Sequence, residues 1–201
     1  MSTTPPLPRT AAVVVAAGQG LRAGQPLPKQ FARWRGKPVV RHSVEALAAA
    51  GISPIVVAIP EGAEDVAGTA LSGIAGVQLV TGGATRQLSV RHGLEALAGS
   101  APDFVLIHDA ARPILPPSVI ARLLAARAIQ QAAIPALPVA DCLAHDEDGM
   151  MGSPADRNAL RRVQTPQAFH FGAISRLLPV ARSIPISAKR PASKPGRFIA
   201  R

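Results

Sequence analysis

The sequence has no tyrosine, and aromatic residues make up only 3% of it. Rings on which single-stranded nucleic acid could stack are therefore scarce, although the formal net charge is +10. Half of that charge lies in residues 183–201, which carry five lysines and arginines and no acidic residue. The remaining basic residues stand singly beside glycines and prolines rather than in a helical stripe, so we expect no nucleic-acid partner.

Cysteine and long hydrophobic runs are also nearly absent. Cys142 stands alone, which excludes an internal disulfide and a zinc site made of cysteines and fits a reducing compartment. No apolar run approaches the roughly 20 residues that span a bilayer. Residues 1–10 lack the basic and then apolar pattern of a secretory signal. The sequence therefore predicts a cytoplasmic protein with no membrane partner.

The 201 residues, 48% of them hydrophobic, suffice for one α/β domain with a substantial core. Apolar runs and helical spacing alternate along the chain. Strands are expected at 11–17, 55–59, 77–80, 104–107 and 132–137, and helices at 38–50, 62–72, 85–98 and 118–131. This alternation predicts a mostly parallel sheet covered by helices on both faces. We assign residues 1–182 to this domain and expect the basic, proline-rich tail 183–201 to be disordered.

A polar stretch, residues 139–171, interrupts the alternation. It contains an acidic turn, and short extended pieces flank that turn. We interpret it as a β-arm that protrudes from the sheet. An arm with little core of its own usually needs a partner surface, so the stretch suggests a homodimer.

The first expected strand runs directly into Gly18-Gln19-Gly20, which lets backbone N–H groups approach a phosphate. Arg22 and Lys29 add the cations that an anionic ligand needs. The Walker pattern is absent, and no acidic residue follows about 20 residues on to hold the ribose of a dinucleotide. The loop is therefore better suited to a nucleoside triphosphate, with an ordinary glycine-rich turn as the alternative.

Two more expected strands end in loops that carry residues able to bind a ligand. Gly82 and Gly83 precede a helix whose backbone donors favour anions and polar rings, and Ser89 in that helix could bind a base or ribose. A simple N-cap at Thr85 is the alternative. Asp109 can bind Mg²⁺ or a sugar hydroxyl and Arg112 a phosphate, unless the two form a structural salt bridge. Because ligands bind beyond the carboxyl ends of parallel strands, we expect the three loops to converge.

Five motifs occur in order over residues 11–182: AAGxGxR, PKQ, GGxxRxxSV, HDAARP and DRNxLxxxQTPQxF. Together they resemble the 2-C-methyl-D-erythritol 4-phosphate cytidylyltransferase family. The resemblance implies a Rossmann-like nucleotidyltransferase fold and transfer of CMP from CTP to methylerythritol phosphate, with release of pyrophosphate, in non-mevalonate isoprenoid synthesis. It also implies Mg²⁺ as cofactor, bridging the CTP phosphates, with Asp109 as a candidate metal ligand.

The resemblance also implies roles for individual residues. Arg22 and Lys29 would stabilise the transition state of the catalysed step. The cytidine would be held by Ala16, Ala17, Gly18, Gly20, Gly83 and Ser89. Asp109, Ala110 and Arg112 would contact methylerythritol phosphate. Arg157 and Thr165 would bind the phosphate of that substrate, in the family from the partner subunit's arm.

Two departures from the family pattern leave alternatives open. Cys142 stands where the family usually has threonine, and the family's later Thr-Asp-acidic-Ala segment that helps bind substrate, its closing strand and its substrate-binding lysine do not appear. We therefore expect a chain that is cut short or frameshifted near Arg182 and is weakly active or inactive, with a genuine variant whose basic tail serves a partner or folds over the site as the alternative. A cytidylyltransferase for another polyol phosphate, such as ribitol phosphate, and an inactive nucleotide-binding remnant are the competing hypotheses.

Overall fold

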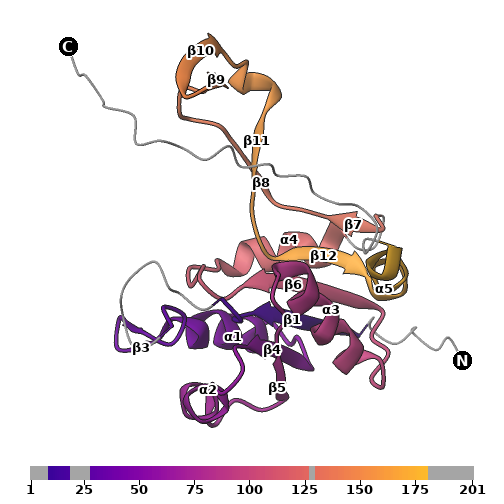
Figure 1. Ribbon diagram of the computed structural model, residues 1–201. Coiled ribbons are helices and arrows are strands. Elements are labelled where there is room, and N and C mark those ends of the chain that lie inside the picture. Colours follow the sequence, from indigo (N-terminus) through magenta and orange to yellow (C-terminus); the bar gives the residue numbers. More distant parts are fainter. Residues whose placement is uncertain (1–8, 19–27, 127–129, 181–201) are drawn as a thin grey trace, which may run out of the picture.

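The computed structural model describes residues 9–18, 28–126 and 130–180. Within these residues a central sheet has the strand order β5-β4-β1-β6-β12-β7 (Figure 1). Its strands are β1 (Thr10–Val15), β4 (Ile55–Ile59), β5 (Val77–Thr81), β6 (Phe104–Asp109), β7 (Ala132–Ala133) and β12 (Gln167–His170). The first four run parallel, whereas β12 is antiparallel to both β6 and β7. The predicted mostly parallel α/β sheet is thus confirmed.

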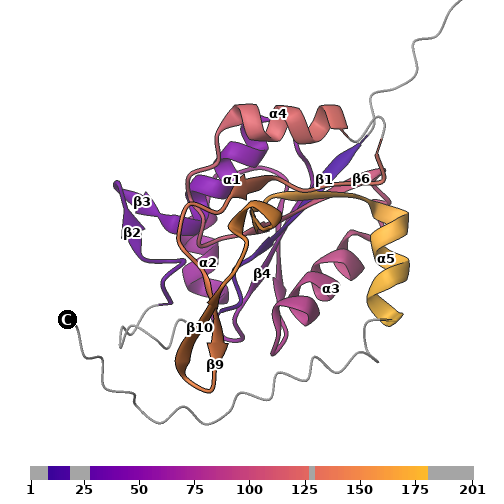
Figure 2. The same ribbon diagram turned by 90° about the horizontal axis from the view of Figure 1, so that it is seen from above.

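Helices cover both faces of this sheet (Figure 2). Three of them pack on one face: α1 (Val39–Ala49), α2 (Glu64–Leu71) and α4 (Pro117–Ala126). The other face is covered by α3 (Arg86–Leu97) and α5 (Phe171–Val180). Strand β1 serves both layers, since Ala12 and Val14 point into the first and Ala11 and Val13 into the second. Burial on both faces explains why β1 is a continuous apolar run rather than an alternating one.

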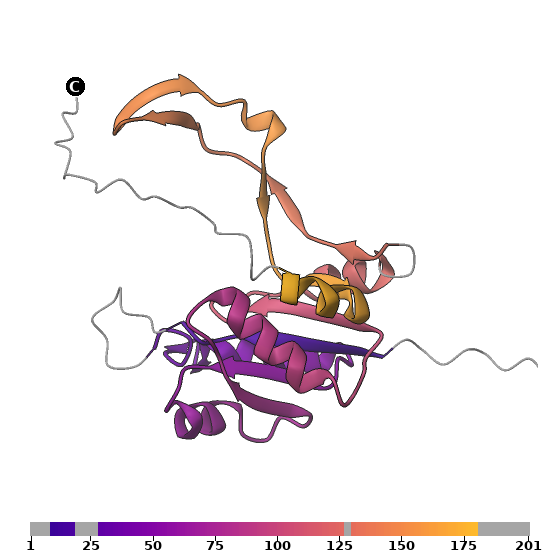
Figure 3. The same cartoon turned by 45° about the vertical axis from the view of Figure 1, so that its right-hand side comes forward.

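A long arm stands away from the sheet and its helices (Figures 1 and 3). At its base β8 (Ala136–Pro138) pairs with β11 (Arg161–Val163), and further out β9 (Ala144–Glu147) pairs with β10 (Met150–Pro154). A 3-10 helix, Arg157–Ala159, lies between β10 and β11. The extended pairing of the arm therefore runs from β8 to β11, while Gln167–His170 within the expected arm belongs to the central sheet.

The prediction of a single strand at 132–137 was wrong. It is divided into β7, which pairs with β12 at the edge of the sheet, and β8, which pairs with β11 in the arm. Pro135 lies between the two pieces and has no N–H to donate to a ladder, so the chain changes partners there. A small hairpin, β2 (Arg33–Trp34) with β3 (Lys37–Pro38), precedes α1. None of the described helices is long and apolar enough to cross a membrane.

Candidate functional site

A pocket of about 650 Å³ opens where β1, β5 and β6 end. The register pairs Val15 of β1 with Asp109 of β6, and the Gly82 N–H donates to the Ile59 carbonyl at 2.8 Å. These pairings bring together the three loops that follow the strands. The lining residues are Val15, Ala16, Ala17, Gly18, Lys29, Gln30, Gly83, Ala84, Thr85, Arg86, Ser89, Asp109, Ala110, Ala111 and Arg112.

Most of the candidate site residues lie in this pocket. It includes Ala16, Ala17, Gly18, Lys29, Gly83, Ser89, Asp109, Ala110 and Arg112. Gly20 and Arg22 lie outside the described residues. Arg157 is on the arm, where its guanidinium donates to the Ala140 carbonyl at 3.0 Å, and it does not line the pocket. Thr165 lies at the foot of the arm and lines a neighbouring pocket of about 510 Å³ instead, but its hydroxyl accepts from the Asp109 N–H at 3.3 Å.

Gln30 is a site residue that the sequence reasoning missed. Its side chain is 2% exposed, and its amide donates to the carbonyls of Ala16 and of Gly18, the latter at 2.9 Å. These bonds tie the end of β1 to the PKQ segment, so the adjacent Lys29 is brought to the pocket. The available signal was the position of this glutamine directly after Lys29, in a segment stiffened by prolines. A side-chain amide that becomes buried there needs hydrogen-bond partners, and the nearby backbone carbonyls can supply them.

The second loop is held by the first turn of α3. Thr85 caps the helix by accepting from the Leu88 N–H at 3.1 Å, as an N-cap threonine should. The buried hydroxyl of Ser89 donates to the Thr85 carbonyl at 3.0 Å and accepts from the Gly83 N–H at 3.1 Å. In this form Ser89 therefore fixes the shape of the Gly82-Gly83 turn rather than presenting a free hydroxyl to the pocket.

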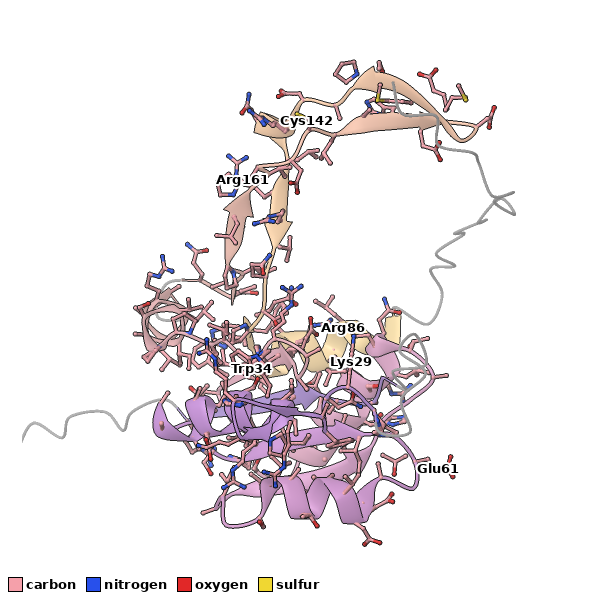
Figure 4. All side chains as sticks on the ribbon, turned by 90° about the vertical axis from the view of Figure 1, so that its left-hand side faces the viewer. Lys29, Trp34, Glu61, Arg86, Cys142 and Arg161 are labelled. Carbon is pink, nitrogen blue, oxygen red and sulfur yellow. The ribbon has the colours of Figure 1, made fainter. Side chains whose placement is uncertain are left out.

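The pocket is positively charged. Arg86 Nε lies 2.8 Å from Asp109 Oδ1, and Arg112 Nε lies 3.6 Å from the other carboxylate oxygen. Lys29 and Arg86 lie close together on the side of the body that faces the arm (Figure 4). Three cations against one carboxylate favour an anionic ligand, and the start of α3 adds backbone donors. Arg86 was missed because an arginine in a first helical turn usually points to solvent.

Asp109 is the one metal-ligand candidate that the sequence named. Among the described residues no group of three histidine, cysteine or acidic side chains could hold a metal ion. Both oxygens of Asp109 also face arginines. One carboxylate suits Mg²⁺, which commonly binds one or two carboxylates together with substrate phosphates. The pocket therefore fits a metal ion that is coordinated mainly by the phosphates of a bound triphosphate, and not one that is coordinated mainly by protein side chains.

His108 lies behind the pocket, next to Asp109, and is 0% exposed. Its Nδ1 lies 3.1 Å from Thr165 Oγ1, and its Nε2 lies 3.2 Å from both Ser43 Oγ and the Arg112 carbonyl oxygen. Burial lowers the pKa of His108 from 6.5 to about 4. The hydrogen bond to Arg112 and the Asp109 charge oppose this shift, and the Arg112 and Arg86 charges add to it. The ring is therefore neutral at physiological pH.

This neutral histidine should make the fold sensitive to acid. Between pH 6.5 and pH 4 the unfolded chain protonates His108 and the folded chain does not, so stability falls as pH falls. The shift corresponds to about 3 kcal/mol at pH 4. Urea unfolding of the wild type and of His108→Gln at pH 7 and pH 4 measures it. The wild type should lose about 3 kcal/mol more than the variant, and equal losses would contradict a neutral buried ring.

The comparisons with known proteins agree with this geometry. Residues 10–184 match the family IspD: 2-C-methyl-D-erythritol 4-phosphate cytidylyltransferase. The chain is 62% identical to a bifunctional enzyme IspD/IspF of Erythrobacter litoralis over 87% of its own length and 45% of that protein. It is 49% identical to a 2-C-methyl-D-erythritol 4-phosphate cytidylyltransferase of Cereibacter sphaeroides, over 82% of this chain and 74% of that one.

A solved structure gives the same result. The crystal structure of 2-C-methyl-D-erythritol 4-phosphate cytidylyltransferase from Thermus thermophilus superposes with a TM-score of 0.72 at 34% identity, covering 87% of this chain and 76% of that one. The chain spans about half the length of the bifunctional relatives that it matches. Since the family match covers most of the chain and the motifs converge on one pocket, the chain belongs to the 2-C-methyl-D-erythritol 4-phosphate cytidylyltransferase family.

Proposed function

We propose that this chain transfers the cytidylyl group of CTP to 2-C-methyl-D-erythritol 4-phosphate in isoprenoid precursor synthesis. A phosphate oxygen of the polyol substrate attacks the α-phosphorus of CTP. The bond from that phosphorus to the bridging oxygen then breaks, and pyrophosphate leaves. The observation that carries the proposal is the convergence of the three strand-end loops, with Lys29, Arg86 and Arg112, on one pocket.

Catalysis of this kind depends mainly on positioning and charge stabilisation. Lys29, together with Arg22, neutralises the charge that builds up around the α-phosphorus. The backbone of Ala16–Gly18 and Gly83 holds the cytidine, with Gly20 in the same loop and Ser89 supporting the turn. Asp109, Ala110 and Arg112 bind the polyol, and Thr165 binds its phosphate. A Mg²⁺ ion held by the triphosphate and by Asp109 as the candidate protein ligand would supply further charge neutralisation.

The test is pyrophosphate release from CTP and methylerythritol phosphate in the presence of Mg²⁺. Ribitol phosphate serves as the comparison substrate. Turnover of CTP with methylerythritol phosphate but not with ribitol phosphate supports the proposal. Faster turnover with ribitol phosphate would identify ribitol phosphate as the substrate instead. CTP binding without turnover on either substrate would identify an inactive nucleotide-binding protein. The expectation that the chain is only weakly active is measured in the same assay.

We also propose that the arm pairs two copies of the chain. Large apolar side chains are exposed along it, among them Leu143, Met150, Met151 and Leu160. Exposed apolar surface of this kind marks interaction sites. Arg157 sits on this arm and does not line the pocket of its own chain. Thr165 does not line that pocket either, but its hydroxyl accepts a hydrogen bond from the Asp109 N–H of its own chain, so we assign Thr165 to its own site and Arg157 to the partner's.

Arg157→Ala should raise the KM for methylerythritol phosphate by about tenfold or more, because a charge-assisted hydrogen bond to a phosphate is lost. The KM for CTP should change little. Steady-state kinetics with each substrate varied in turn measures both values. Arg161→Ala, a neighbour whose side chain bonds only local carbonyls among the described residues, is the control. Equal rises in both KM values would place Arg157 elsewhere in the site.

Mixing two impaired variants, assayed at methylerythritol phosphate concentrations far below the wild-type KM where both turn over slowly, tests whether the arm acts across the dimer. In a mixed dimer of Lys29→Ala with Arg157→Ala, one site carries both changes and the other carries neither. Random pairing should therefore restore activity to about a quarter of the wild-type level. If Arg157 acted in its own subunit, every site would carry one change and mixing would restore nothing. Sedimentation of the wild type checks that dimers are present.

A further inference from the structure

His108 has no role in the reaction as described so far, although it is a buried polar residue that contacts both substrate-binding segments. Its Nδ1 faces Thr165, and its Nε2 faces the carbonyl of Arg112 and the hydroxyl of Ser43. The ring is fully buried, so bulk solvent does not reach it and these three groups are its hydrogen-bond partners among the described residues. The hydrogens on the two ring nitrogens therefore decide which way the Thr165 hydroxyl can donate.

In the first arrangement Nε2 carries the hydrogen. It donates to the Arg112 carbonyl, which can only accept, and Nδ1 then accepts from the Thr165 hydroxyl. The same hydroxyl accepts from the Asp109 N–H. The single hydroxyl hydrogen of Thr165 is therefore donated to His108, and the hydroxyl cannot also donate to a phosphate oxygen.

In the second arrangement Nδ1 carries the hydrogen and donates to Thr165 Oγ1. The Ser43 hydroxyl, 3.2 Å from Nε2 and 3.3 Å from the Arg112 carbonyl, turns from that carbonyl to donate to the ring. Thr165 then accepts from both His108 and Asp109, and its own hydrogen is free for a phosphate oxygen. No heavy atom has to move between the two arrangements. The proton on Nε2 is released to water and Nδ1 takes one up from water during a transient opening of the buried site, so the charge of the ring is unchanged.

We propose that His108 is a positioning residue for the phosphate of the polyol substrate, and that phosphate binding selects the Nδ1–H tautomer, which frees the Thr165 hydroxyl to donate. The proposal rests on the proposed function, because it takes Thr165 as a contact of that phosphate. A hydroxyl that already accepts two hydrogen bonds has its remaining hydrogen directed away from both donors. His108 thus acts through Thr165 and does not itself touch substrate.

The direct test is nitrogen NMR of the full chain with ¹⁵N-labelled histidine, since the two tautomers give different ring-nitrogen shifts. His108→Gln assigns the signal by its loss. The free protein should show a protonated Nε2, and saturating 2-C-methyl-D-erythritol 4-phosphate should move the hydrogen to Nδ1. The change should vanish in Thr165→Val. An unchanged His108 tautomer at saturating substrate overturns the proposal whether or not the chain turns over, so its failure is separable from failure of the cytidylyl transfer.

Kinetics supply a second readout that a merely structural role would not move. Asparagine places its amide near the Nδ1 position and glutamine near the Nε2 position. His108→Gln should raise the KM for methylerythritol phosphate by about tenfold with little change in the KM for CTP, and His108→Asn should restore much of the loss. Both differences should disappear when combined with Thr165→Val. Equal effects of the two substitutions on both substrates would contradict action through Thr165.

Discussion

Lys29→Ala should lower kcat by on the order of a hundredfold to a thousandfold while the protein remains folded. Lys29 is exposed and lines the pocket, and its side chain makes no ion pair within the described part of the chain. Its loss therefore removes a charge from the reaction and not from the core. The backbone around it is held by the buried Gln30, so neighbouring groups should stay in place.

The measurement is the rate of pyrophosphate release, with thermal unfolding as a check on the fold. Lys37→Ala is the matched control, because Lys37 is also exposed and its ion pair with Glu45 lies on the surface. A surface pair contributes little to stability, so this variant should retain wild-type turnover. Lys29→Arg keeps the charge but changes its position and donor geometry, and should fall between the two. Near-parental turnover of Lys29→Ala would remove Lys29 from the reaction.

The parts of the fold that were predictable are those decided by neighbours in the sequence. The apolar run Ala11–Val15 predicts a strand buried on both faces, and the glycines that follow β1 and β5 predict loops at the ends of these strands. Because the strands are parallel, it followed that their carboxyl ends, and the loops with the candidate site residues, lie at one edge of the sheet. The pocket that contains Gly18, Gly83 and Asp109 is the consequence.

The parts that were not predictable depend on contacts between distant segments. No local pattern shows that β12 inserts antiparallel beside β6, and this pairing is what brings Thr165 to Asp109, 56 residues away. An arginine in a first helical turn usually points to solvent, and nothing local shows that Arg86 instead pairs with Asp109, 23 residues further on. His108 looked like part of a motif, and only its buried position shows that it links Thr165 to Arg112.

Gly82→Ala should damage both the fold and CTP binding, because the first and second loops touch at this residue. A Cβ on Gly82 would overlap the methyl group of Ala17 and lie 2.9 Å from Ser89 Oγ. The Ala17 methyl is fixed to the backbone and cannot swing aside, so one loop must shift. Overpacking of this kind costs about 1–3 kcal/mol, and we expect at least a tenfold loss of CTP affinity.

Urea unfolding and calorimetric titration with CTP measure the two effects of Gly82→Ala. Gly99→Ala is the control, since a Cβ there meets nothing within 4 Å. The double variant Ala17→Gly with Gly82→Ala moves one methyl group from the first loop to the second and removes their overlap. It should recover part of both losses, with Ser89 Oγ as the remaining close neighbour, and the two changes should therefore be non-additive. If the double variant is no better than Gly82→Ala, the contact between the loops is not what shapes the CTP pocket.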